Sequence, residues 1–283
     1  MMSGLVLSTF TGAGLLDRGF IEAGYCVVSA GDPMFGQPAI EGFHPPAGAF
    51  EGVIGGPPCQ MWAQSHNLAG DKSKHANLIP EFERVVAEAQ PEWFLMENVI
   101  GAPVPEIAGY HIVDRKIHAW ELGSPQRRYR RFSFGSKPPV QFMWPSGEKP
   151  PKLGLTLTGA PTPQRRRDGQ RNAIMPTLLA DHDGGAPKST LNPDRYEHAR
   201  KVLPTLAGAN STQRRSGETK SERINGKTCF TLDDYRYGFG LPDDWDAPAL
   251  LKEFKFKVLG NGVPLQVACA LAEAVRYATR QEA

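Results

Sequence analysis

The sequence has few cysteines, no long apolar run and no leader-like start, and each absence excludes a class of protein. Its four cysteines lie far apart and form no CxxC pair. We therefore expect a reducing interior with neither a disulfide framework nor a zinc site, and we assign no residue to a metal. No run of about 18 apolar residues exists, so no membrane span is expected. The first residues lead into a strand-like Leu5-Val6-Leu7 without a basic segment ahead of an apolar one, which argues against a signal peptide.

The sequence also has little net charge, only +2 over 283 residues, but that charge is unevenly distributed. Residues 136–228 hold 16 Lys and Arg against 8 Asp and Glu, a local excess of +8 that leaves the remainder near −6. A basic segment on a slightly acidic body suggests a polyanionic partner. The alternative is a solvated surface of scattered charge.

The length allows one large domain, or a large domain that carries a small second one. Residues 136–228 are rich in Pro, Gly, Arg, Ser and Thr and have weak apolar periodicity. We predict a small loop-rich domain there, inserted between residues 1–135 and a C-terminal segment, 229–283, that completes the larger domain. This last segment ends in an amphipathic helix from about Pro264 to Arg280.

The first part of the chain has the order strand, glycine loop, helix, strand, acid. Residues 4–9 predict a strand, Phe10 to Gly14 a glycine loop, 15–24 a helix and 25–30 a second strand, followed by Asp32. Glycines allow close backbone approach to a ligand, and an acid after the second strand can accept ribose hydrogen bonds. The pattern indicates an adenosine-containing cofactor. The missing third glycine of the dinucleotide fingerprint argues against a nicotinamide.

A stiff turn follows the next apolar run. Gly52-Val53-Ile54 predicts a buried strand that ends in Gly55-Gly56-Pro57-Pro58, and Cys59 comes directly after it. Prolines fix φ and donate no N–H, so the chain must leave the sheet there. Cys59 is then expected at the carboxyl edge of the sheet, where open α/β sheets bind ligands. A buried structural cysteine is the alternative. Residues 61–76 predict a loop and 77–90 a helix.

Two further clusters carry chemistry. Glu97 directly follows the apolar strand Trp93 to Met96, so it would lie at the same edge as Cys59 if both strands are parallel; the alternative is an acid that caps a turn. After a strand pattern at 110–120 comes Gln126-Arg127-Arg128-Tyr129-Arg130-Arg131. Alternation along a strand would send Arg128 and Arg130 to one face, where they suit phosphate or base contacts. A solvated basic edge strand is the alternative.

These pieces, in this order, resemble the DNA cytosine-5 methyltransferase family. The glycine loop Phe10–Gly14 resembles the family's cofactor motif, Gly56-Pro57-Pro58-Cys59-Gln60 its nucleophile motif and Glu97-Asn98-Val99 its acid motif. Gln126 to Arg130 is similar to its Gln-x-Arg-x-Arg strand. Leu259 to Pro264 is similar to its closing motif, and Thr231 to Trp245 to the segment before that.

The resemblance implies an α/β fold: a doubly wound, Rossmann-like domain that binds S-adenosylmethionine, with residues 136–228 as a target-recognition domain. Phe10 would stack on the adenine and Asp32 would bind the ribose. The implied cofactor-binding residues are Phe10, Gly12, Gly14, Asp32, Pro58, Leu78, Asn261 and Val263. The partner would be double-stranded DNA, contacted by Gln60, Gln126 and a Thr-Leu pair at Thr177 or Thr205, a choice that the sequence leaves open.

The resemblance also implies a mechanism. The Cys59 thiolate would add to C6 of a flipped-out cytosine, and C5 would take the methyl group. Glu97 in its acid form would hydrogen-bond N3. Arg128 would hold the base O2 or a phosphate, and Arg130 would brace the nucleophile loop or the backbone. The protein is expected in the cytoplasm of a bacterial or phage-infected cell, near the nucleoid, as a monomer or a homodimer.

The chain departs from the family pattern in three places. Ala39-Ile40 stands where an adenine-binding acid is usual, and Trp62-Ala63 replaces a Phe-Ser pair. Only 28 residues separate Glu97 from Gln126, and 101–109 hold two prolines, so we expect the family's usual helix to be missing and one sheet face to be partly uncovered. Two other functions stay open: a DNA-binding protein that has lost turnover, and a related enzyme that acts on RNA or uses an altered cofactor.

Overall fold

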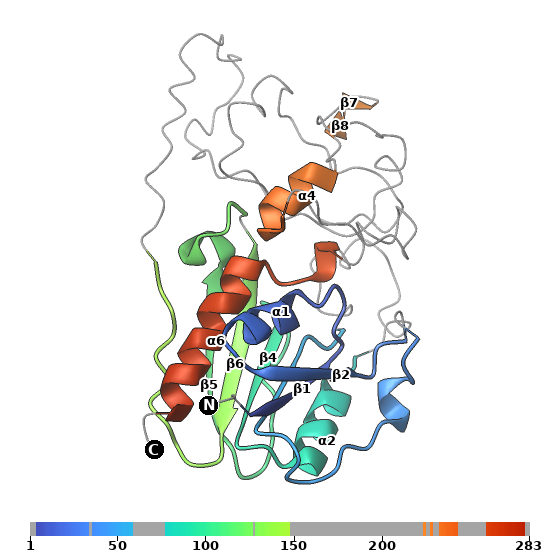
Figure 1. Cartoon of the computed structure of the whole chain (residues 1–283), viewed down its shortest axis with the longest axis vertical. Coiled ribbons are helices and arrows are strands. Elements are labelled where there is room, and N and C mark those ends of the chain that lie inside the picture. Colours follow the sequence, from blue (N-terminus) through green and yellow to red (C-terminus); the bar gives the residue numbers. More distant parts are fainter. Residues whose placement is uncertain are drawn as a thin grey trace. The chain divides into compact units, whose positions relative to one another are not determined.

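A computed structural model describes residues 4–33, 36–58, 77–126, 128–147, 223–224, 227–228, 232–242 and 259–280 (Figure 1). The chain divides into two compact units. The first comprises 1–117, 129–146 and 262–283, and the second comprises 118–128 and 147–261. The predicted boundaries at 135 and 228 stay a prediction, because most of the stretch between them lies outside the described residues.

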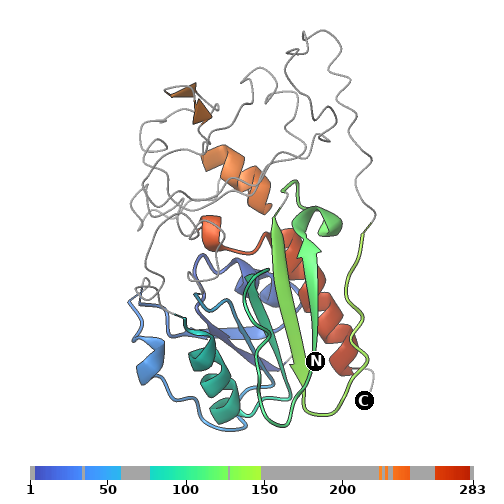
Figure 2. The same ribbon diagram turned by 180° about the vertical axis from the view of Figure 1, so that it is seen from behind.

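The first unit is built on a six-stranded sheet with the order β2-β1-β3-β4-β6-β5. Its strands are β1 (Leu5–Thr9), β2 (Cys26–Ala30), β3 (Gly52–Gly55), β4 (Trp93–Val99), β5 (His111–His118) and β6 (Tyr129–Ser136). Strands β2, β1, β3 and β4 pair in parallel, and β6 runs antiparallel to β4. Strands β6 and β5 lie side by side at one margin of the sheet (Figure 2).

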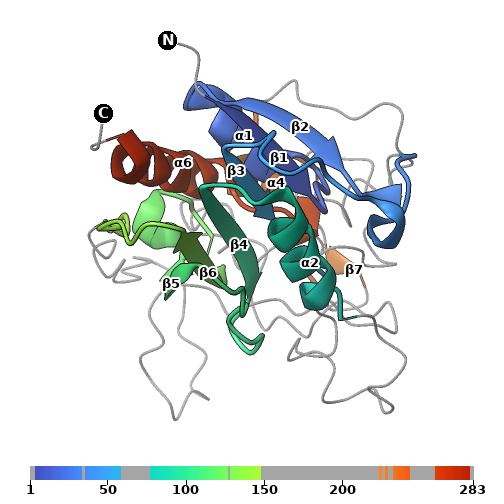
Figure 3. The same ribbon diagram turned by 90° about the horizontal axis from the view of Figure 1, so that it is seen from below.

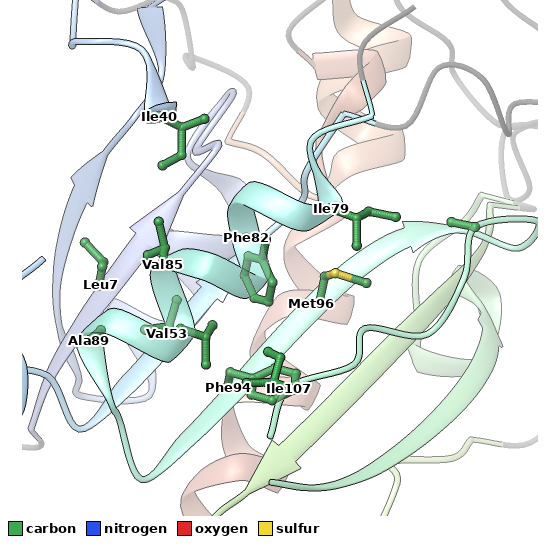
Figure 4. Close-up of a cluster of buried hydrophobic side chains, with 12 residues drawn as sticks. Leu7, Ile40, Val53, Ile79, Phe82, Val85, Ala89, Phe94, Met96 and Ile107 are labelled. Atoms are coloured by element: carbon green, nitrogen blue, oxygen red, sulfur yellow. The ribbon is translucent and has the colours of Figure 1, made fainter. Parts of the chain in front are cut away.

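One face of this sheet is covered by α2 (Ile79–Ala89). Its apolar side, spaced three and four residues apart, packs on Leu7 of β1, Val53 of β3 and Phe94 of β4 (Figure 4). The members of this cluster are buried, among them Phe82 and Val85, neither of which has exposed surface. The predicted helix at 77–90 and the strands on either side of it are confirmed.

The opposite face is covered by α1 (Leu15–Glu22) and α6 (Leu265–Arg280) (Figure 3). Phe20 of α1 stacks on Trp93 of β4, with ring centroids 5.8 Å apart. Alternation along β4 points Trp93 away from Phe94, so helices lie on both faces. The predicted doubly wound α/β fold is therefore confirmed for this unit.

Helices α1 and α6 approach closely at Gly19. A Cβ atom built on Gly19 would lie 2.5 Å from the backbone carbon of Ala268. Since both contacting groups sit in rigid helices, we expect Gly19→Ala to lower the free energy of unfolding by about 1–3 kcal/mol. Urea denaturation followed by circular dichroism measures this. Gly42→Ala is the matched control, because Gly42 is exposed with no heavy atom within 4 Å of its built Cβ; an equal loss there would contradict the packing argument.

The sheet face beside the segment between Glu97 and Gln126 is covered in part, by residues 102–110, while Asp114 and Lys116 of β5 stay exposed. Ala102 and Ile107, in the irregular segment after β4, are buried in the α2 cluster, and Tyr110 packs edge-on against Phe94 at 5.4 Å. A short apolar segment thus does the covering that a helix would do. Residues 33–51, in their described part, contain the short 3₁₀ helix η2 (Ile40–Gly42).

The described part of the second unit contains the 3₁₀ helix η6 (Ala119–Leu122), the helix α4 (Leu232–Phe239) and a short antiparallel pair, β7 (Arg223–Ile224) and β8 (Lys227–Thr228). The carbonyl of Gly238 in α4 accepts hydrogen bonds from Ser124 Oγ at 3.1 Å and from Gln126 Nε2 at 2.6 Å. Across all described residues, no helix has the length and apolar character that crossing a membrane requires.

Candidate active site

The carboxyl ends of three parallel strands lie together at one edge of the sheet. In the register, Gly55 of β3 lies beside Thr9 of β1 and Met96 of β4. The segments that follow these positions, Phe10–Gly14, Gly56–Pro58 and Glu97–Val99, are therefore neighbours, as the sequence predicted. A Cβ atom built on Gly56 would lie only 3.2 Å from Glu97 Oε2. The backbone that leads to Cys59 thus passes directly beside the Glu97 carboxylate.

The glycine loop after β1 uses backbone conformations that favour glycine. Gly12 and Gly14 have φ of +56° and +68°, and Phe10 shares the left-handed region at +55°. The Gly12 N–H donates to Asp32 Oδ2 at 2.8 Å. Asp32 at the end of β2 therefore holds the glycine loop in this structure, in addition to its predicted contact with a ribose.

A second carboxylate, that of Asp17, lies at the other end of the same loop. Ser8 Oγ donates to Asp17 Oδ1 at 2.5 Å, which ties the end of β1 to the first turn of α1. Burial raises the pKa of Asp17, while hydrogen bonds from Ser8 and Thr11 act to lower it. The sequence pattern pointed to no role for Asp17. Its only signal was an acid in the first turn of a helix, which is an ordinary feature of helices.

Glu97 and Arg130 form an ion pair next to the proline turn. Arg130 Nε lies 3.1 Å from Glu97 Oε1, and Glu97 is only 8% exposed. The antiparallel register of β4 and β6 places Arg130 opposite Val99, so the two side chains meet diagonally across the strands. The family resemblance implies a catalytic role for both residues, and the structure brings them together.

Arg128 and Gln126 lie in the second unit, where both are buried. Arg128 is 2% exposed, and its guanidinium donates to the carbonyl oxygens of Gly260 at 2.8 Å and Asn261 at 3.1 Å. It also lies over the ring of Phe239, 6.0 Å from the centroid. In this structure Arg128 is thus engaged with backbone, and its predicted contact with a base or a phosphate remains a prediction.

The remaining predicted residues divide into described and undescribed ones. Phe10 and Leu78 pack at the margin of the α2 cluster, Pro58 and Asn261 are exposed and Val263 is buried. Cys59, Gln60, Thr177 and Thr205 lie outside the described residues. No group of three or more His, Cys, Asp or Glu side chains in the described ranges could hold a metal ion.

Two cysteines are described, and one of them has a perturbed thiol. Burial, together with Glu22, which accepts the Cys269 S–H at 3.3 Å, raises the pKa of Cys269 to about 11. At pH 7 only about one thiol in 10⁴ would then be ionised. We expect alkylation of Cys269 by iodoacetamide to accelerate about tenfold per pH unit between pH 7 and 10.

Peptide mass spectrometry after timed alkylation measures this rate. Glu22→Gln removes the neighbouring charge and should speed the reaction at pH 8. A Cys269 rate that is independent of pH over this range would contradict the expected pKa. The result bears on catalysis, because a thiol protonated at neutral pH is a poor nucleophile.

A family model described as "C-5 cytosine-specific DNA methylase" matches residues 39–276. The type II methyltransferase M.NgoPII of Neisseria gonorrhoeae is 23% identical over 96% of this chain and 95% of that protein. The type II methyltransferase M.FnuDI of Fusobacterium nucleatum is 29% identical over 177 residues, 51% of this chain, and the match spans only 52% of that relative.

Solved structures show the same fold at low sequence identity. The methyltransferase EhMeth of Entamoeba histolytica is 11% identical and superposes with a TM-score of 0.57, over 99% of this chain and 100% of that chain. The Dnmt2 methyltransferase of Schizosaccharomyces pombe is 12% identical, with a TM-score of 0.56 over 97% and 99% of the two chains.

Proposed function

Because the chain belongs to the C-5 cytosine-specific DNA methylase family, whose members are DNA cytosine-5-methyltransferases, we propose that it methylates C5 of cytosine in double-stranded DNA. One observation carries the assignment to this site. The proline turn that leads to Cys59, the Glu97 carboxylate and the Arg130 guanidinium lie side by side at the carboxyl ends of β3, β4 and the start of β6. The similarity of the chain to type II methyltransferases supports a role in restriction-modification.

The glycine loop fits S-adenosylmethionine as the cofactor. A Cβ atom built on Gly12 would meet nothing closer than 3.9 Å, so the left-handed loop leaves room for a ligand to approach the backbone. Asp32 and Phe10, beside this loop, offer a carboxylate for ribose hydroxyls and a ring for the adenine. The cofactor supplies an electrophilic methyl group when it is bound.

The residues of this chain act on the cytosine. Cys59, as thiolate, adds to C6, which makes C5 nucleophilic. Glu97 in its acid form donates a hydrogen bond to N3 and stabilises the charge that develops there. Arg130, 3.1 Å from Glu97, orients that carboxyl group. Loss of the C5 proton then expels Cys59. Because C5 and C6 are inaccessible in a stacked duplex, the base must be flipped out before the reaction begins.

The direct test uses S-adenosylmethionine labelled in its methyl group and duplex DNA of mixed sequence. We expect label on cytosine C5, located by nuclease digestion and mass spectrometry. DNA that binds but acquires no label would overturn the enzymatic proposal in favour of a binding protein. Label that enters RNA and not DNA would overturn the choice of substrate.

A further inference from the structure

The parallel ladder between β3 and β4 ends at the proline turn. It pairs Gly55 with Met96, so the next positions along the two strands are Gly56 beside Glu97 and Pro57 beside Asn98. Pro57 and Pro58 have no N–H, so these two residues cannot donate to the ladder. The carbonyls at this point still need donors, because a buried unpaired carbonyl is costly.

The side chain of Asn98 supplies one of these donors. Its Nδ2 donates to the Pro57 carbonyl at 3.3 Å, and its Oδ1 accepts the Val99 N–H at 2.8 Å. Asn98 is 2% exposed, so solvent does not compete for these bonds. Both ends of the amide are thus engaged, one with the proline turn and one with its own strand.

The following carbonyl has a donor from the other side of the segment. The Leu78 N–H, just before α2, donates to the Pro58 carbonyl at 3.1 Å. Asn98 and Leu78 therefore fix two consecutive carbonyls immediately before Cys59. Of these two donors only Asn98 is a side chain, and it follows Glu97 directly on β4, so it fixes the turn relative to the residue proposed to act on N3.

We propose that Asn98 is a positioning residue, which holds the Pro57–Pro58 turn in register with Glu97 and so sets where the nucleophile segment meets the base. This inference rests on the proposed function and assigns to that reaction a residue that touches neither base nor cofactor. Small misplacements of a reacting group are costly in rate, about 10²-fold for 1 Å.

Asn98→Asp is the sharpest variant, because it keeps the size and the acceptor for the Val99 N–H. It replaces the donor to Pro57 by an oxygen, which turns an attraction into a repulsion. We expect covalent adduct formation with a 5-fluorocytosine duplex, at saturating DNA and S-adenosylmethionine, to slow by about 10–100-fold. The affinity for S-adenosylmethionine, measured by calorimetry without DNA, should not change.

Val85→Ala is the control for a loss of stability alone. Val85 is buried in the cluster under α2, so this variant should melt at a lower temperature and still form the adduct at the wild-type rate at 25 °C. If Asn98→Asp forms the adduct as fast as wild type, the inference is overturned. It is also overturned if the variant loses affinity for S-adenosylmethionine in proportion to its loss of rate. A wild-type protein that forms no adduct would overturn the proposed function itself, and this inference with it.

Discussion

Cys59→Ser is expected to lower the rate of methyl transfer to DNA by more than about 10³-fold, as removal of a covalent nucleophile does in other enzymes. A serine hydroxyl is hardly ionised at neutral pH and is a much weaker nucleophile than a thiolate, so addition to C6 would fail. The variant should also fail to form the covalent adduct with a 5-fluorocytosine duplex. Denaturing gel electrophoresis with labelled DNA measures both the adduct and its rate of formation.

The matched controls are Cys26→Ser and Cys269→Ser. Cys26 is exposed on β2, and Cys269 lies on α6 with its S–H directed to Glu22. Both should retain methyl transfer and adduct formation, since neither lies at the carboxyl edge of β3. An adduct that survives Cys59→Ser and disappears in either control would move the nucleophile to another residue.

Glu97→Ala is expected to lower kcat by about 10²–10⁴-fold while DNA and S-adenosylmethionine still bind. The change removes the group proposed to act on N3 and leaves Arg130 without the carboxylate that lies 3.1 Å from its Nε. Single-turnover labelling at saturating DNA separates this loss from any change in binding. Glu97→Gln separates hydrogen bonding from proton transfer, because an amide can donate a hydrogen bond to N3 but cannot transfer a proton.

Asp114→Asn provides a control ion pair on the same sheet. Asp114 of β5 lies 3.4 Å from Arg131 of β6, one residue along from Arg130, so its removal perturbs a comparable pair away from the site. We expect kcat to stay at the wild-type value. If Glu97→Ala and Asp114→Asn behave alike in single-turnover experiments, Glu97 does not act on N3.

The strands, the helices and the shared edge of the sheet could be predicted because they depend on local patterns. Apolar runs that end at Gly55 and Met96 are short enough for buried strands, and the helix between them explains why the two strands are parallel. Parallel strands bring their carboxyl ends to the same edge, so the neighbourhood of Glu97 and the proline turn follows from topology alone. The proximity of Arg130 to Glu97 requires in addition only that β6 pairs with β4 in the antiparallel direction.

The contacts that were not predicted are those set by side-chain geometry between distant segments. Arg128 donates to carbonyls 132 and 133 positions away, and nothing in the Gln-x-Arg-x-Arg pattern distinguishes that from a phosphate contact. The amide of Asn98 looked like one more polar residue at a strand end. The covering of the sheet by Ala102 and Ile107 was missed because a short stretch with two prolines was expected to leave that face partly uncovered.

The packing of α1 against α6 also has a consequence for synthesis of the chain. Glu22 and Cys269, which meet across these helices, are 247 positions apart. A ribosome adds roughly 5–20 residues per second, so α1 emerges about 12–50 s before its partner is made. During that interval the side of α1 around Gly19 has no helix to pack on. We therefore expect nascent chains that lack α6 to require chaperones.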